Sequence, residues 1–339
     1  MSKRKLNRRQ SWRIARQQEE RNSRAQRSEQ RGEAALQGGE LGVEQSGVVV
    51  ARYGAQADIR DQEEQVHRCF LRSNLGSPVA GDRVTFCAGD AAGVVVALEE
   101  RDTALKRPDK FGDLRTMAAN IDRVIIVIAP IPEPHGNLID RYLVATENFG
   151  ADAVVLLNKA DLLTDPDLEQ RMTALLEPYA PLHYPVIYAR GKEGGIEELS
   201  ELLKGHTSIL VGQSGVGKTT LVNALLPDAD QRVGELSQQR GKGRHTTTTA
   251  RLFALPGGGE LIDSPGIREF GLWHLSRDEI EQGFREFHNC IGQCRFRDCR
   301  HQGEPDCAMT AAIAAGQIHP ARLDSYRHIV ASLDANLQG

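Results

Sequence analysis

The segment from Gly212 to Thr219, GQSGVGKT, constrains the fold more than any other part of the chain, because it fits the pattern G-x-x-x-x-G-K-[ST]. It follows the apolar run SILV and opens a segment with helical periodicity, the context that a phosphate-binding loop requires. Glycines let the backbone turn its N–H groups toward phosphate oxygens, and the start of the helix adds partial positive charge. Lys218 is expected to reach the β- and γ-phosphates, and the Thr219 hydroxyl to hold Mg²⁺. The sequence therefore predicts a nucleotide-binding α/β domain.

A second motif, the tetrapeptide Asn158-Lys-Ala-Asp161, ends the apolar run AVVLL. The Asp161 carboxylate can accept hydrogen bonds from guanine N1–H and the exocyclic amine, a pair of donors that adenine lacks. Asn158 would orient the base, and the Lys159 stem would pack on it. Asp263 ends a further apolar strand in the sequence Asp-Ser-Pro-Gly. It can hold Mg²⁺, directly or through water, while the Gly266 amide meets the γ-phosphate. Together these segments predict a guanine-nucleotide site.

The order of the motifs is unusual, because Asn158 precedes Gly212, whereas ordinary GTPases carry the phosphate loop first. The strands must therefore be circularly permuted. Apolar strands alternate with helices from about residue 120 onward, which predicts a parallel sheet covered on both faces. In this order the segments that sense the γ-phosphate lead directly into residues 275–339. We expect a nucleotide-dependent movement to be passed to that last segment.

The segment between the phosphate loop and Asp263, GKGRHTTTTARL, has the Gly- and Thr-rich composition expected of a nucleotide-responsive switch loop. Thr247 or Thr248 is expected to complete the shell around Mg²⁺ and the γ-phosphate. Many GTPases orient the attacking water with a glutamine just after D-x-x-G, but Ile267 stands there and cannot do so. His245 is the nearest candidate for that role, since a neutral imidazole can orient or deprotonate water. The alternative is a histidine that faces RNA or solvent.

Cys294, Cys299, His301 and Cys307 gather three thiols and one imidazole in the C-terminal part of the chain. This is the ligand set of a closed tetrahedral zinc site, and four protein ligands leave no open position for catalysis. Cys290 could replace Cys294 if the loop folds differently, and a set of reduced thiols without metal is the alternative interpretation. The sequence predicts one structural Zn²⁺ ion.

The remaining parts of the chain differ sharply in charge and pattern. Residues 46–99 contain short β-branched runs separated by Gly and Asp, typical of a small five-stranded barrel. Residues 1–31 carry eleven Lys/Arg and three acidic residues, a net charge of +8, so the remaining 308 residues carry −12. A basic arm commonly binds nucleic acid through counterion release, although a solvated tail without a target fits as well.

Composition also bears on the compartment. No apolar run approaches the ~18 residues of a membrane helix, and the N-terminus MSKRKLNRRQ lacks the apolar stretch of a secretory signal. Six cysteines are too few for a disulfide scaffold in a chain of 339 residues. We therefore expect a cytoplasmic protein with reduced thiols and no membrane partner.

Taken together, these segments resemble the RsgA family, the circularly permuted GTPases of small ribosomal subunit biogenesis, over about residues 46–335. The resemblance is carried by GDRV, AANIDRV, NKAD, GQSGVGKTTLVNAL, GRHTTTT, DSPGIREFGL and CRFRDCRH followed by Cys307. It implies a multidomain protein with an α/β core. The implied parts are an OB-fold β-barrel (46–112), a circularly permuted P-loop GTPase domain (113–274) and a helical zinc-binding domain (275–339). Residues 1–45 precede them as a basic arm, which we expect to be disordered because it has few apolar residues.

The resemblance implies a GTPase that binds the small (30S) ribosomal subunit and its rRNA and assists late maturation. We expect it to be a monomer. The resemblance also implies that the subunit stimulates hydrolysis of GTP to GDP and phosphate, and that His245 acts on the attacking water. Two alternatives remain: an RNA-binding checkpoint protein in which GTP is mainly a conformational ligand, and a translation or tRNA-modification GTPase. The expected GTP contacts are Asn158, Lys159, Asp161, Gly212, Gln213, Ser214, Gly215, Val216, Gly217, Lys218, Thr219, Thr220 and Gly266.

Overall fold

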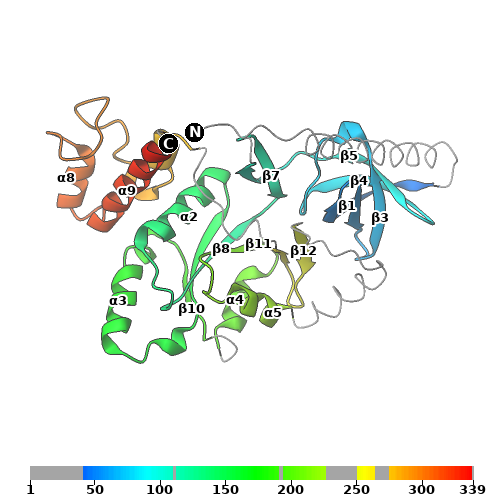
Figure 1. Ribbon diagram of the computed structural model, residues 1–339, viewed down its shortest axis with the longest axis horizontal. Helices are drawn as coiled ribbons and strands as arrows, with labels where there is room; N and C mark the ends of the chain where they lie inside the picture. The colour runs from blue at the N-terminus through cyan, green and yellow to red at the C-terminus, as the bar shows by residue number, and fades with distance from the viewer. Residues whose placement is uncertain (1–40, 110–111, 191–193, 227–249, 264–274, 338–339) are drawn as a thin grey trace, which may run out of the picture. The chain divides into compact units, whose positions relative to one another are not determined.

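The computed structural model describes residues 41–109, 112–190, 194–226, 250–263 and 275–337 (Figure 1). It divides into two compact units, Met1–Arg101 and Asp102–Gly339. Most of the predicted basic arm, residues 1–40, lies outside the described part. None of the described helices combines the length and apolar composition that a bilayer crossing requires.

The first unit is a closed five-stranded barrel, as the sequence predicts. β1 pairs with β2 and β4, β3 pairs with β2 and, in parallel, with β5, and the β4–β5 pair completes the ring. β1 begins at Leu41, earlier than the predicted boundary at residue 46. The strands are β1 (Leu41–Tyr53), β2 (Gln56–Arg60), β3 (Val66–Leu71), β4 (Arg83–Gly89) and β5 (Gly93–Leu98).

The barrel closes because β1 is long enough to serve two partners, and Val48 pairs with residues of both β2 and β4. At the neighbouring Gly47 a Cβ would lie 2.7 Å from Ile59 Cγ2 and 2.8 Å from the Arg60 carbonyl oxygen. A side chain there would push β2 away, so glycine permits the tight crossing. The enclosed core comprises Val49, Ala57, Ile59, Cys69, Leu71, Val84, Phe86 and Val95.

The second unit contains a sheet in the order β10-β9-β8-β11-β13-β12. Neighbouring strands run parallel from β10 to β13, and β12 is antiparallel to β13. The runs RVIIVI and DAVVLL are almost wholly buried, because helices cover both faces of a parallel sheet. The strands are β8 (Arg123–Ile128), β9 (Asp152–Leu157), β10 (Val186–Tyr188), β11 (Thr207–Val211), β12 (Arg251–Ala254) and β13 (Glu260–Asp263).

Helices alternate with these strands, as the sequence predicts. They are α2 (Gly136–Phe149), α3 (Pro166–Leu176), α4 (Ile196–Leu203) and α5 (Lys218–Leu225). A hairpin of β6 (Ala104–Pro108) and β7 (Leu114–Ala119) precedes β8 and was not predicted. Because the compact units divide between Arg101 and Asp102, this hairpin belongs to the second unit, and the domain limits expected from the sequence stay predictions.

The C-terminal segment is mainly helical and packs against α2 through α9 (Figure 1). It contains α7 (Arg277–Gln282), η4 (Arg285–Phe287), α8 (Ala308–Ala314) and α9 (Pro320–Leu337). α7 begins with a capping box between Ser276 and Glu279. α9 contributes Leu323, Tyr326 and Ile329 to the core, and each of them is at most 1% exposed.

Candidate functional site

The phosphate loop joins β11 to α5 and turns at three glycines with positive φ: Gly212 at 139°, Gly215 at 86° and Gly217 at 97°. Residues with a Cβ are strained in this region of backbone space. Gly212 also passes close to β8, because a Cβ there would lie 2.1 Å from the Val127 carbonyl oxygen. Glycine is therefore required both for the turns of the loop and for its packing on the sheet.

Lys218 opens α5 and is only 7% exposed. Its Nζ donates to the carbonyl oxygens of Gly212 at 2.5 Å and Gln213 at 2.6 Å, which holds the ammonium inside the loop. A positive charge held at this point is suited to the phosphates of a nucleotide. The exposed residues of the loop and of the first turn of α5 are Ser214, Gly215, Thr219 and Thr220, whereas Val216 is buried.

The Asn158-Lys-Ala-Asp161 segment contacts the phosphate loop through its first two side chains. Asn158 Nδ2 donates to the Val216 carbonyl oxygen at 2.9 Å, and Lys159 Nζ donates to that of Gly215 at 2.6 Å. These contacts arise because β9 and β11 both pair with β8 and run parallel to it, so their carboxyl ends meet at one edge of the sheet. The structure thus joins the predicted base and phosphate motifs, although Asn158 comes earlier in the chain.

Two polar groups of this segment are suited to a ligand. Asn158 is 1% exposed, and its Oδ1 has no hydrogen-bond partner among the described residues. A buried acceptor of this kind is normally satisfied by a ligand or an ordered water. Asp161 lies in the short helix η2 (Ala160–Leu162) and is exposed. Gly217 leaves room for the carboxamide, since a Cβ there would lie 2.4 Å from Asn158 Nδ2.

Asp263 ends β13, which pairs with β11, so it lies at the same sheet edge as the phosphate loop. The Thr219 hydroxyl and the Asp263 carboxylate offer the oxygen ligands that Mg²⁺ prefers. The remaining predicted residues of the nucleotide site, His245, Thr247, Thr248 and Gly266, lie outside the described part of the chain.

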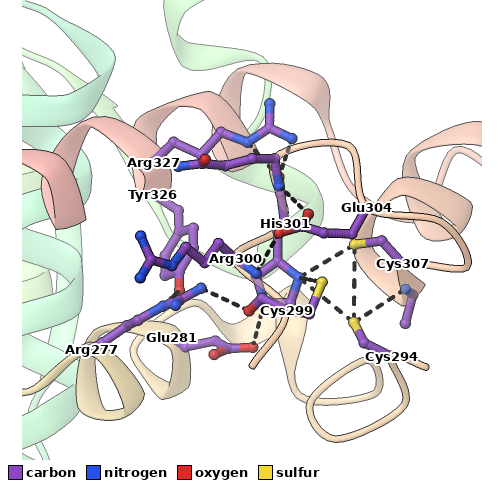
Figure 2. A network of polar contacts seen from close by, with 12 residues as sticks. Arg277, Glu281, Cys294, Cys299, Arg300, His301, Glu304, Cys307, Tyr326 and Arg327 are labelled. Carbon is purple, nitrogen blue, oxygen red and sulfur yellow. Dashed lines mark hydrogen bonds and ion pairs between the residues drawn. The ribbon is translucent and has the colours of Figure 1, made fainter. Parts of the chain in front are cut away.

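The four predicted metal ligands converge in the C-terminal segment (Figure 2). The sulfurs of Cys294 and Cys299 each lie 3.6 Å from His301 Nδ1, and that of Cys307 lies 3.3 Å from it. The sulfurs of Cys294 and Cys307 are 4.0 Å apart. Zn–S bonds of ~2.3 Å and Zn–N bonds of ~2.0 Å in a tetrahedron separate ligand atoms by about 3.5 to 3.8 Å. The cluster therefore fits one closed, four-coordinate metal ion of zinc's size.

Side chains from α7 and α9 hold this cluster in place, as Figure 2 shows. Glu281 Oε1 lies 3.2 Å from His301 Nε2, which fixes the ring so that Nδ1 faces the sulfurs. Arg277 donates to the Cys299 carbonyl oxygen at 2.9 Å, and Arg327 donates to that of His301 at 2.6 Å. Sequence reasoning missed these three residues. The one local signal is that Arg277 and Glu281 are four residues apart, on one face of α7.

The protonation of the thiols differs within the cluster. Burial raises the pKa of Cys299 to about 12. Burial also favours the neutral Cys307 thiol, but hydrogen bonds with Thr310 and His301 outweigh it and lower the pKa of Cys307 to about 6. A bound metal ion would have to hold Cys299 as a thiolate against the effect of burial, because metal ligation demands deprotonated sulfur. Cys290, the predicted substitute for Cys294, is buried and lies outside the group of four.

Comparisons with known proteins agree with this arrangement. The family model of the RsgA GTPase matches residues 98–273. The "Small ribosomal subunit biogenesis GTPase RsgA" of Azotobacter vinelandii is 55% identical, and so is that of Pseudomonas aeruginosa, each alignment covering 98% of both chains.

Two solved structures are similar as well. YjeQ from Thermotoga maritima has a TM-score of 0.71 and 32% identity, covering 86% of this chain and 99% of that one. YloQ, described as a circularly permuted GTPase, has a TM-score of 0.70 and 25% identity, covering 87% of this chain and 96% of that one. The permuted order of the motifs and these full-length similarities lead to one conclusion: the chain belongs to the RsgA family of GTPases.

Proposed function

We propose that this chain hydrolyses GTP on the small ribosomal subunit, and that the state of its nucleotide times its stay there during late maturation. The observation that carries the proposal is the contact of Asn158 and Lys159 with the phosphate loop. This contact supports the proposal, because it joins the segment predicted to select guanine to the loop predicted to bind phosphate in a member of the RsgA family. The relatives named as small ribosomal subunit biogenesis GTPases supply the partner.

The proposal assigns a part in the reaction to each residue of the predicted nucleotide site. Lys218 and the loop N–H groups hold the β- and γ-phosphates, and Asp161 selects guanine. His245 orients a water in line with the γ-phosphorus and accepts its proton, while the bond from that phosphorus to the β–γ bridging oxygen breaks. Mg²⁺, held by Thr219, Asp263 and Thr247 or Thr248, would neutralise the charge that develops on the phosphate oxygens. The products are GDP and phosphate.

The Cys/His cluster is proposed to hold one structural Zn²⁺, since three thiolates and an imidazole form a donor set that zinc prefers. Its loop presents Phe296, which is 43% exposed and lies 5.6 Å from the Arg295 guanidinium. On the barrel, the Arg68 guanidinium lies 5.1 Å from the Tyr53 ring. Arginine–aromatic pairs suit unpaired bases and their phosphates. We assign rRNA contacts to these surfaces and to the basic arm of a cytoplasmic monomer.

The base assignment is tested with Asp161→Asn. Xanthine carries an oxygen where guanine carries the exocyclic amine, so asparagine, which can donate there, should reverse the preference from GTP to XTP. Binding of fluorescent GTP and XTP analogues measures this, with Asp167→Asn in α3 as an exposed carboxylate control. An unchanged preference for GTP in Asp161→Asn would remove the guanine assignment.

The partner is tested by sedimentation of the full chain with purified ribosomal particles. We expect the protein loaded with a non-hydrolysable GTP analogue to sediment with small subunits, and the GDP form to be released. Sedimentation with 70S particles, or binding to tRNA instead, would favour a translation or tRNA-modification GTPase.

A further inference from the structure

A buried ionic cluster joins the C-terminal segment to the nucleotide-binding sheet. Arg322 of α9 and Asp140 of α2 are each 1% exposed. The Arg322 guanidinium contacts the Asp140 carboxylate and, through Nε at 2.5 Å, the carboxylate of Glu286 in η4. It also lies 4.6 Å from the centre of the Phe284 ring and 5.4 Å from that of Tyr179. One arginine therefore links α2, η4 and α9 in an environment without solvent.

A contribution to folding stability does not by itself explain why the protein contains this buried ionic cluster. Buried ion pairs can often be replaced by apolar side chains of similar volume without loss, because desolvation offsets the attraction between the charges. The position of Asp140 suggests another reason. The Tyr179 hydroxyl donates to Asp140 Oδ1 at 2.9 Å and lies 3.4 Å from the carbonyl oxygen of Gly136, the first residue of α2. The cluster thus fixes the beginning of α2.

The segment that leads into α2, residues 129–135, contacts both nucleotide motifs. Its Ile131 carbonyl oxygen accepts from Lys159 Nζ at 3.3 Å, and the same Nζ donates to the Gly215 carbonyl oxygen at 2.6 Å. Pro132 lies against the phosphate loop, because its Cδ is 3.7 Å from where a Cβ on Gly215 would be. Any displacement of the beginning of α2 would therefore reach the Lys159 contact.

We propose that Arg322 is a positioning residue for nucleotide binding: by holding Asp140, α9 keeps α2 and residues 129–135 in the position that the Lys159–Gly215 contact requires. The C-terminal segment then sets the affinity for the nucleotide. Linkage makes the effect reciprocal, so bound nucleotide strengthens the docking of α9 on α2. This inference rests on the nucleotide site of the proposed function, and it adds a route between that site and the C-terminal segment.

A second ion pair, between η4 and α2, provides a matched control. Arg285 forms an ion pair with Glu147 at 2.7 Å, and the Tyr184 hydroxyl donates to Glu147 at 3.1 Å. This arrangement repeats the arginine, carboxylate and tyrosine of the Arg322 cluster, but Glu147 lies in the last turn of α2, far along the helix from residues 129–135. A variant at Arg285 disturbs the docking of α2 without acting on its beginning.

The test compares Arg322→Ala, Arg322→Lys and Arg285→Ala in the full chain. Arg322→Lys keeps a positive charge beside the buried carboxylates, so it can fold even if Arg322→Ala does not, but it lacks the planar fork that contacts both. Fluorescent GDP titration gives the dissociation constant, and bound metal is measured for each variant. We expect Arg322→Lys to weaken GDP binding about fivefold or more, Arg285→Ala to change it less than about twofold, and metal content to stay constant.

Thermal unfolding with and without GDP supplies the reciprocal measurement. GDP should raise the Tm of Arg322→Lys by less than it raises the Tm of the wild type or of Arg285→Ala. Unchanged GDP affinity in Arg322→Lys, with only a lower Tm, would make Arg322 a merely structural residue and overturn the proposal. A loss of affinity that parallels a loss of metal would overturn it too. If the wild type itself failed to bind guanine nucleotides, the proposed function would fail instead.

Discussion

The nucleotide site and the Cys/His cluster are built in opposite ways. The phosphate loop is formed by backbone, depends on glycines with positive φ and leaves Asn158 Oδ1 without a partner in the described residues. The cluster is formed by side chains whose four ligand atoms lie within 4.8 Å of one another. Its ligand His301 contacts Glu281. A site for an exchanging ligand can keep an unsatisfied group, whereas a permanent ion requires a complete shell.

This contrast predicts the largest effect for removal of the metal. Structural zinc sites contribute about 10–16 kcal/mol of binding free energy to folding, so chelation should release α7 and α9 from the cluster. Hydrogen exchange should rise across residues 275–337 and far less in the barrel, and acid should promote release because protons compete for the thiolates. A matched incubation with zinc-saturated chelator, which cannot take up the metal, is the control. Unchanged exchange after proven metal loss would contradict a structural ion.

The next largest effect is expected at Lys218, on the other side of the comparison. Lys218→Ala removes the charge held inside the phosphate loop, and loss of one such stabilising group typically lowers turnover about 10²- to 10³-fold. Steady-state GTP hydrolysis measures this, while metal content should not change. Normal turnover in Lys218→Ala would contradict the loop's role, and metal loss would show that the two sites are not separate.

A variant of Glu281 tests whether the residues around the Cys/His cluster contribute to its metal affinity. Glu281→Ala should lower metal affinity about 10- to 100-fold, because His301 loses the partner of its second nitrogen. Competition with a chromogenic chelator measures the affinity, and Asp278→Asn, an exposed carboxylate of the same helix, is the control. Equal affinities in both variants would remove the positioning role.

The smallest effect is expected at Asn158. Asn158→Ala removes the hydrogen bond to Val216, which should cost about 1 kcal/mol of folding stability and weaken GDP binding. Denaturant unfolding and fluorescent GDP titration measure the two effects. Stability that falls without any change in GDP binding would mean that the contact with the phosphate loop is only structural.

The sequence predicts a structural feature well when the residues that form it are close together in the chain. The strand–loop–helix around Lys218 follows from local spacing, and it agrees with the structure. Contacts between residues that are distant in the chain do not follow from local spacing. Glu281 meets His301, and Arg322 meets Asp140, only because α7, α9 and α2 pack together in the folded protein.

Two strands could not be predicted from the sequence, because they also depend on contacts with other parts of the chain. The β6 strand, ALKRP, lacks an apolar alternation, and β12 is a short strand of four residues. Both depend on pairing with a neighbour rather than on their own pattern. The pairing of β1 with both β2 and β4 could not be predicted either. The need for glycine at position 47 is apparent only in the folded barrel, where Ile59 leaves no room for a side chain.

If the permuted guanine-nucleotide site serves a ribosome-linked GTPase, the rate of GTP turnover must respond to purified small subunits. We expect saturable stimulation that weakens with salt, as binding to rRNA requires, and that is lost in His245→Ala while GTP affinity is kept. Turnover that does not respond to small subunits would rule out a ribosome-linked GTPase and favour a checkpoint protein for which GTP is only a conformational ligand.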